Sequence, residues 1–99
     1  MCGIAGVWHA DRSRAVDPAI LQAMDAALAH RGPDGAGIHV REGFGFAHRR
    51  LSIVDLAAGK QPMATADGTL VVVFNGEIYN YLELRAELER EGFVFRTNS

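Results

Sequence analysis

The sequence contains a single cysteine, Cys2, so the chain cannot form an internal disulfide bond. This scarcity of cysteine fits a reducing compartment. No apolar run reaches the roughly 20 residues that a membrane-spanning helix needs, and the opening residues lack the charged n-region of a signal peptide. We therefore expect a cytoplasmic protein with no membrane partner.

Excess charge of either sign is also absent. The chain has 12 acidic and 10 basic residues and a net charge of -2, so no large basic field exists to recruit nucleic acid. The arginines also lack the interleaved aromatic side chains that stack on bases. The histidines do not follow a metal-ligand spacing, and we expect no metal in this segment; they are His9, His30, His39 and His48.

The chain is short, and its 99 residues allow at most one small domain. A hydrophobic content of 48% with 22% charged residues is typical of a globular protein. The sequence stops just after an expected strand, and we interpret it as a fragment. Its sheets would then be incomplete, so we expect the isolated chain to fold poorly or to aggregate.

In the first half, local patterns predict a strand, a helix and a pair of strands. The apolar run over residues 3–8 indicates a buried strand that carries Cys2 at its start. Asp17 and Pro18 are a helix start signal, and the helix should end near His30, before the turn at Gly32-Pro33. Residues 37–40 and 44–48 read as two strands joined by a turn.

In the second half, Asp67-Gly68 indicates a hairpin. The continuous apolar run over residues 70–74 predicts a strand covered on both faces. Asn80 and Glu83 have the spacing of a capping box at the start of a helix, which Gly92 should end. A last strand is expected over residues 93–95. Together these elements predict an α+β layered fold.

Cys2 is the residue with the clearest chemical potential. Cysteine is small, so we expect removal of Met1, which would leave a thiol and a free α-amine on one residue. The thiol is a nucleophile, and the amine is a weak base with a pKa of about 7.7–8.0. One residue would thus supply a nucleophile and its base. The alternative is a small apolar residue with no catalytic role.

Asn75-Gly76 allows two interpretations. The pair is common in hairpin turns, and a plain turn is the simpler explanation. However, a side-chain amide beside a backbone N–H at the end of a strand can direct two donors at one developing negative charge. Glycine at position 76 also allows the backbone to approach a substrate closely.

Five segments in order carry a family resemblance. They are Met1-Cys2-Gly3-Ile4-Ala5-Gly6, His30-Arg31-Gly32-Pro33-Asp34-Gly35, His48-Arg49-Arg50-Leu51-Ser52-Ile53-Val54-Asp55, Gln61-Pro62-Met63 and Asn75-Gly76-Glu77-Ile78-Tyr79-Asn80. Together they resemble the glutaminase domain of class II glutamine amidotransferases, within that group most closely the glutamine-hydrolysing asparagine synthetase branch. The resemblance runs from residue 1 to residue 99.

The resemblance implies an N-terminal-nucleophile hydrolase fold, a four-layer αββα sandwich that is incomplete in this chain. It implies hydrolysis of the L-glutamine side-chain amide. The ammonia would pass to a synthetase domain, absent here, which uses ATP and Mg to convert aspartate to asparagine. No cofactor is implied for this segment, and a homodimer is one option for the full-length protein.

The resemblance also assigns roles to residues. Cys2 is the nucleophile, and Asn75 and Gly76 form the oxyanion hole. Arg50 binds the glutamine α-carboxylate, which suits a guanidinium fork. The other implied substrate-binding positions are Leu51, Ser52, Ile53, Val54 and Glu77.

Glu77, Arg49 and Asp34 allow interpretations other than a part in the reaction. Glu77 could instead be a solvated surface residue. Arg49 is expected to be solvated, and Asp34 is expected to have a structural role in its turn. In the family, an Asp that binds the α-amine follows the segment ending at Ser99, and it is missing here.

Three hypotheses follow from the residues and the resemblance. The first is part of a glutamine-dependent asparagine synthetase. The second is a related amidotransferase with another acceptor, as in polysaccharide or exosortase gene clusters. The third is a truncated product that is inert or serves as an interaction module. Acceptor choice lies in the missing domain, so these 99 residues do not separate the first two.

Overall fold

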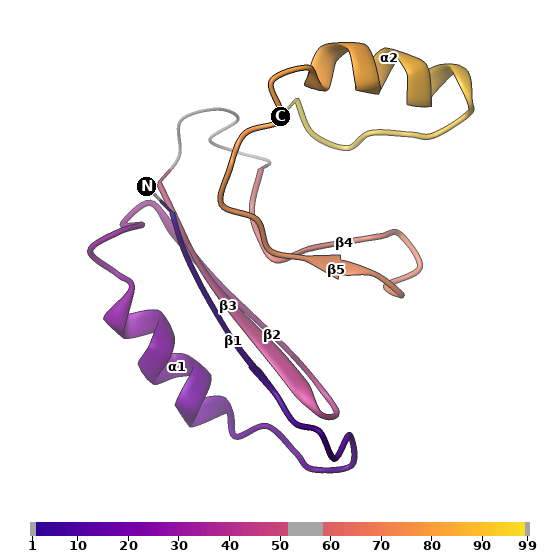
Figure 1. The fold of residues 1–99 in the computed structure, drawn as a ribbon. Helices are drawn as coiled ribbons and strands as arrows, with labels where there is room; N and C mark the ends of the chain where they lie inside the picture. Colours follow the sequence, from indigo (N-terminus) through magenta and orange to yellow (C-terminus); the bar gives the residue numbers. More distant parts are fainter. Residues whose placement is uncertain (1, 52–58, 99) are drawn as a thin grey trace.

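The computed structural model describes residues 2–51 and 59–98. The described residues fold into two small antiparallel sheets and two helices, which confirms the expected α+β class (Figure 1). In chain order the elements are β1 (Gly3–Trp8), α1 (Pro18–Ala27), β2 (Gly35–Arg41), β3 (Phe44–Arg50), β4 (Met63–Ala64), β5 (Val71–Val72) and α2 (Tyr81–Arg90).

The larger sheet has the strand order β1-β3-β2, with β3 in the centre. Gly3 lies opposite Arg49 at one end of the β1–β3 pair, and Trp8 lies opposite Phe44 at the other. Helix α1 packs on one face of this sheet, and the β4–β5 hairpin lies on the other side (Figure 1). Both strands of the predicted pair are longer than expected, because the ladder runs from Gly35 opposite Arg50 to Arg41 opposite Phe44.

Helix α1 begins where the sequence predicts. Asp17 is its N-cap, and the Asp17 carboxylate accepts a hydrogen bond of 2.9 Å from the backbone N–H of Ala19. The helix ends at Ala27, three residues before His30, and Leu28 caps it. Leu21 is fully buried against the sheet, so a single apolar side chain anchors the middle of the helix.

The β4–β5 hairpin turns at Asp67-Gly68, as predicted. Hydrogen bonds from the Thr65 hydroxyl and from the backbone and hydroxyl of Thr69 lower the pKa of Asp67 to about 2. The predicted strand over residues 70–74 is wrong in its length and its burial. Strand β5 is only Val71–Val72, and Val72 is half exposed.

The ladder of this hairpin is short. Met63 pairs with Val72, the last residue of β5. The run that follows β5 has no backbone partner from β4, which begins only at Met63.

Helix α2 differs from its prediction at its first turn. Asn80 is the N-cap, but its side chain makes no capping hydrogen bond, so the predicted capping box is wrong. Gly92, with φ of +96°, does end the helix region. Residues 93–95 form no strand; instead Phe95 lies under the Arg85 guanidinium, 4.8 Å from it, and Arg85 also donates to the Thr97 carbonyl.

Much apolar surface lacks cover in the described part of the chain. The buried hydrophobic side chains there are Val16, Leu21 and Ala47, whereas Leu82, Phe93 and Val94 are mostly exposed. Helix α2 stands apart from both sheets (Figure 1). Poor folding of the isolated 99 residues remains a prediction, and this exposure is its physical basis.

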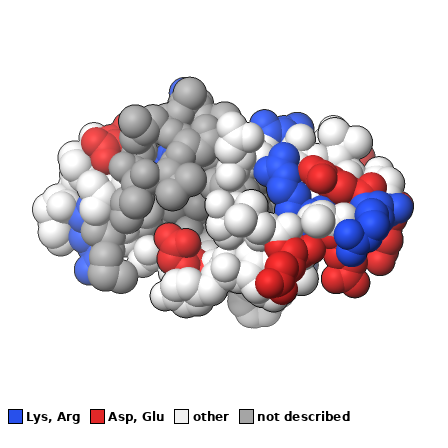
Figure 2. Space-filling model, turned by 90° about the horizontal axis from the view of Figure 1, so that it is seen from above, with Lys and Arg blue, Asp and Glu red and all other residues white. Residues whose placement is uncertain are grey.

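The charged surface is mixed in sign. Seen from above, the described part of this face carries acidic and basic side chains interspersed, gathered toward the right of the view (Figure 2). Among the described residues no helix is long and apolar enough to cross a membrane.

Candidate active site

Cys2 lies directly before β1, at the end of the sheet where β3 also ends. The Cys2 Sγ accepts a hydrogen bond of 3.3 Å from the Leu51 backbone N–H and lies 3.7 Å from the Leu51 carbonyl, to which the thiol donates. The side chain is partly buried. The predicted nucleophile therefore has a backbone donor directed at its sulfur.

The backbone carbonyl of Cys2 is held by two side chains. Asn75 Nδ2 donates to it at 3.1 Å and Arg31 Nε donates to it at 3.3 Å. The Asn75 contact joins positions 73 residues apart and brings a predicted oxyanion-hole residue to the predicted nucleophile. Sequence reasoning missed the Arg31 contact, although Arg31 lies within the second of the five family segments.

Arg50 shares this site. Side-chain directions alternate along a strand. Because Gly3 pairs with Arg49, Cys2 and Arg50 project from the sheet face opposite to α1. Arg50 is only 8% exposed. A largely buried guanidinium on the same sheet face as Cys2 is suited to bind the carboxylate of a small substrate.

The turn after α1 supports the end of β3. The Asp34 backbone N–H donates to the Arg50 carbonyl at 3.0 Å. A Cβ atom at Gly32 would lie 2.3 Å from the carbonyl carbon of Arg49. Glycine is therefore required at position 32, because the turn packs directly on the backbone that presents Arg50.

The expectation for Arg49 is wrong. Instead of being solvated, Arg49 forms a two-pronged ion pair with Asp25 of α1, with Nε–Oδ1 at 2.9 Å and Nη2–Oδ2 at 2.7 Å. Both side chains are mostly buried, 23% and 12% exposed. The ion pair joins α1 to the end of β3. Arg50 lies at this same end, on the opposite face of the sheet.

Breaking this pair should destabilise the protein. We expect Asp25→Ala or Arg49→Ala each to lower the free energy of unfolding by about 1.5–3 kcal/mol, the range for hydrogen bonds to charged groups, because each leaves the other charge without its partner. The double variant should be less destabilised than the sum of the two. Urea unfolding of the natural protein in a double-mutant cycle measures this coupling, and strict additivity would contradict the ion pair.

His48 is a buried residue of the same strand and face. It is 1% exposed, and among the described residues neither of its ring nitrogens has a hydrogen-bond partner. Burial lowers the pKa of His48 below its usual value; the nearby Phe74 backbone opposes this shift and the Arg50 charge adds to it. The His48 imidazole is therefore neutral at physiological pH, and it lies on the same sheet face as Arg50. The sequence analysis excluded a metal-ligand spacing for His48 and assigned it no other role.

The structure describes some of the remaining predicted site residues and not others. Asn75, Gly76 and Glu77 are exposed. Leu51 contacts Cys2 through its backbone. The predicted roles of Ser52, Ile53 and Val54 lie outside the described residues.

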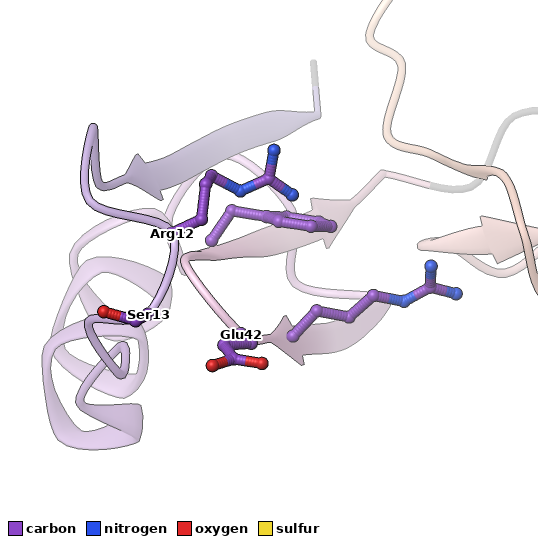
Figure 3. Close-up of a pocket in the computed structure, with 5 residues that line it drawn as sticks. Arg12, Ser13 and Glu42 are labelled. Atoms are coloured by element: carbon purple, nitrogen blue, oxygen red, sulfur yellow. The ribbon is translucent and has the colours of Figure 1, made fainter.

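One open hollow of about 560 Å³ lies elsewhere, around the β2–β3 turn (Figure 3). The sheet register places this turn at the end remote from Cys2. The Arg12 guanidinium lies 5.8 Å from the Phe44 ring centre, and Arg41 donates to the Gly68 carbonyl. Both arginines of the hollow thus already have partners. In the part of the chain that the structure describes, no three His, Cys, Asp or Glu side chains are grouped to hold a metal ion.

Comparison with known proteins gives consistent results. Residues 1–99 match the family described as a glutamine amidotransferase domain. The chain is 46% identical over 101 residues to "Asparagine synthetase [glutamine-hydrolyzing] 1" of Bacillus subtilis, covering 100% of this chain and 16% of that protein. The chain is 48% identical over 101 residues to "Asparagine synthetase [glutamine-hydrolyzing] 2" of Bacillus subtilis, covering 100% of this chain and 13% of that protein.

A plant relative extends this similarity. The chain is 42% identical over 99 residues to "Asparagine synthetase [glutamine-hydrolyzing]" of Zea mays, covering 94% of this chain and 16% of that protein. The chain thus spans no more than 16% of the length of these three relatives. With the family matched over every residue, and with Cys2, Arg50 and Asn75 gathered at one end of the sheet, this chain belongs to the glutamine amidotransferase domain family.

Proposed function

We propose that this chain is the glutamine-hydrolysing part of an asparagine synthetase. It would release ammonia from the side-chain amide of L-glutamine for the ATP-dependent conversion of aspartate to asparagine. The observation that carries the proposal is the pair of contacts at Cys2, whose Sγ accepts from the Leu51 N–H and whose carbonyl accepts from the Asn75 amide.

In the proposed reaction the Cys2 thiolate attacks the carbon of the glutamine amide. The carbonyl π electrons move to oxygen, and collapse of this tetrahedral intermediate breaks the C–N bond and leaves a thioester. Nitrogen takes up a proton and departs as ammonia. Water then attacks the thioester, which gives glutamate and restores the thiol. After loss of Met1, the Cys2 α-amine would carry the protons; residue 1 lies outside the described residues.

The neighbouring groups have matching tasks. The Leu51 backbone, which bonds the Cys2 sulfur through both its N–H and its carbonyl, would hold the sulfur in place for the attack. The Asn75 amide and the Gly76 N–H would receive the oxyanion. Arg50 would bind the α-carboxylate, and Glu77, exposed beside the oxyanion pair, would line the glutamine site.

The rest of the proposed function belongs to parts of the protein beyond these residues. Because the relatives are much longer, a synthetase domain that uses ATP and Mg is the proposed partner of this segment. The proposal includes the four-layer αββα sandwich for the complete domain, the cytoplasm as its location and a homodimer as one option. A different acceptor is not favoured, because these relatives carry the asparagine synthetase name.

Glutamate release from glutamine by the natural full-length protein tests this proposal, and Arg50 tests its substrate geometry. We expect Arg50→Ala to lower kcat/KM for glutamine about 10- to 100-fold, mainly through KM, because a charged hydrogen-bonding partner of the α-carboxylate is lost. The decarboxylated analogue 4-aminobutanamide should be used equally by the variant and the natural protein. Arg90→Ala, at an exposed arginine in the last turn of α2, is the matched control. An unchanged KM would remove Arg50 from the site.

A further inference from the structure

The proposed chemistry gives the Gln61-Pro62-Met63 segment no task. Gln61 nevertheless makes two hydrogen bonds to Phe74, the residue directly before the oxyanion pair. Its Oε1 accepts from the Phe74 backbone N–H at 2.6 Å, and its Nε2 donates to the Phe74 carbonyl at 3.0 Å. One side-chain amide thus satisfies both backbone groups of the residue directly before Asn75.

The side chain takes the place of a missing strand. In the β4–β5 register, Phe74 would lie opposite residue 61, but the backbone ladder ends at the Met63–Val72 pair. A primary amide presents one donor and one acceptor, the same pair that a neighbouring strand would offer. Phe74 lies beyond the end of β5, and the two bonds from Gln61 take the place of the bonds that a partner strand would make.

Gln61 is itself fixed on the larger sheet. A Cβ atom at Gly37 of β2 would lie 2.1 Å from the Gln61 carbonyl oxygen and 2.8 Å from Pro62 Cδ, so the two backbones are in direct contact. His48 lies opposite Gly37 on β3, and the Phe74 backbone influences its pKa. The rigid sheet that places Cys2 and Arg50 thus also supports Gln61.

Phe74 is linked in turn to both predicted oxyanion donors, Asn75 and Gly76. Asn75 follows Phe74 and donates to the Cys2 carbonyl. A Cβ atom at Gly76 would lie 2.7 Å from the Phe74 ring, so the Gly76 backbone is packed on Phe74 as well. A shift of Phe74 would therefore displace both predicted oxyanion donors relative to the Cys2 sulfur.

We propose that Gln61 is a positioning residue of the oxyanion hole, which acts through the Phe74 backbone and touches no substrate. This inference rests on the proposed glutaminase function. Oxyanion donors act by being fixed before the charge develops. Loosening them should therefore raise the barrier of the chemical step while leaving glutamine binding intact.

The test uses Gln61→Glu and Gln61→Met in the natural full-length protein. Glutamate at position 61 keeps an acceptor for the Phe74 N–H but turns a carboxylate oxygen toward the Phe74 carbonyl; methionine keeps the length and removes both bonds. We expect kcat for glutamine hydrolysis to fall about 10- to 100-fold in each, with the glutamine KM within about twofold and ammonia-dependent synthesis unchanged. Gln22→Glu, the same change at an exposed glutamine of α1, should have no effect.

Two inhibitors distinguish a loss of oxyanion-hole positioning from general damage to the glutamine site. L-Glutamate γ-semialdehyde adds to the thiol and forms a tetrahedral adduct whose oxygen occupies the place of the oxyanion, so its Ki should weaken in parallel with kcat. L-Glutamate, which forms no adduct, should bind equally well to the variants. An unchanged kcat, a rise in KM alone or a parallel loss of ammonia-dependent synthesis would each overturn the assignment. Absence of glutamine hydrolysis by the natural protein itself would instead refute the proposed function, and this inference with it.

Discussion

Replacing Cys2 by alanine is expected to lower glutamine-dependent synthesis by the natural full-length protein about 10³-fold or more, because no other group can form the thioester. Ammonia-dependent synthesis should continue at its original rate, because externally supplied ammonia bypasses the glutaminase site. Parallel assays with glutamine and with ammonium chloride measure both. Equal loss of the two activities would contradict the division of labour between the two parts of the protein.

A second form of this experiment tests the α-amine alone. A removable extension placed before Cys2 keeps the thiol but converts the amine into a peptide nitrogen. We expect such a protein to be inactive with glutamine and fully active with ammonia. Cleavage by a protease that leaves cysteine as the first residue should restore the glutamine reaction in the same sample. Full glutaminase activity before cleavage would show that the amine is not the base.

Replacing Asn75 by alanine should reduce kcat for glutamine hydrolysis about 10²- to 10³-fold, equivalent to about 2.7–4 kcal/mol of lost transition-state stabilisation. The glutamine KM should change little, because the negative charge develops only during the reaction. Asn75 also donates to the Cys2 carbonyl, so part of the loss would come from a less ordered nucleophile. Steady-state kinetics of glutamate release measures both parameters.

Asn80 provides the matched control for Asn75. It lies five residues further along, and its side chain makes no capping hydrogen bond to α2. We expect Asn80→Ala to leave kcat and KM unchanged. If both asparagine variants lost activity equally, the effect would lie in the folding of this region rather than in the oxyanion hole.

The elements that the sequence predicted best are those set by local chemistry. The Asp17-Pro18 start of α1 needs only a carboxylate within reach of the Ala19 N–H. The Asp67-Gly68 hairpin and the Gly92 helix end likewise depend on residues that tolerate a positive φ. The strand over residues 70–74 failed because its apolar pattern carries no information about where the partner strand β4 begins.

The site was predicted through its residue types and the family resemblance rather than through geometry. Cys2 and Asn75 do meet, as expected, but through a bond from the Asn75 amide to the Cys2 carbonyl that no local pattern contains. Arg49 was misassigned because two adjacent arginines look alike in a sequence. Their strand directs them to opposite faces, with Arg49 toward Asp25 of α1 and Arg50 on the face that also carries Cys2.

The sequence alone predicted Cys2 as the nucleophile and determined the family and the local turns, because each depends on residue identity over a few neighbouring positions or on segments in a fixed order. Only the tertiary structure decided which arginine is tied to α1, that β5 stops after Val72 and what Gln61 holds. The Arg49 and Gln61 contacts join residues 24 and 13 positions apart. Such contacts are set by how the sheet and the hairpin pack, and packing has no signature in any single segment.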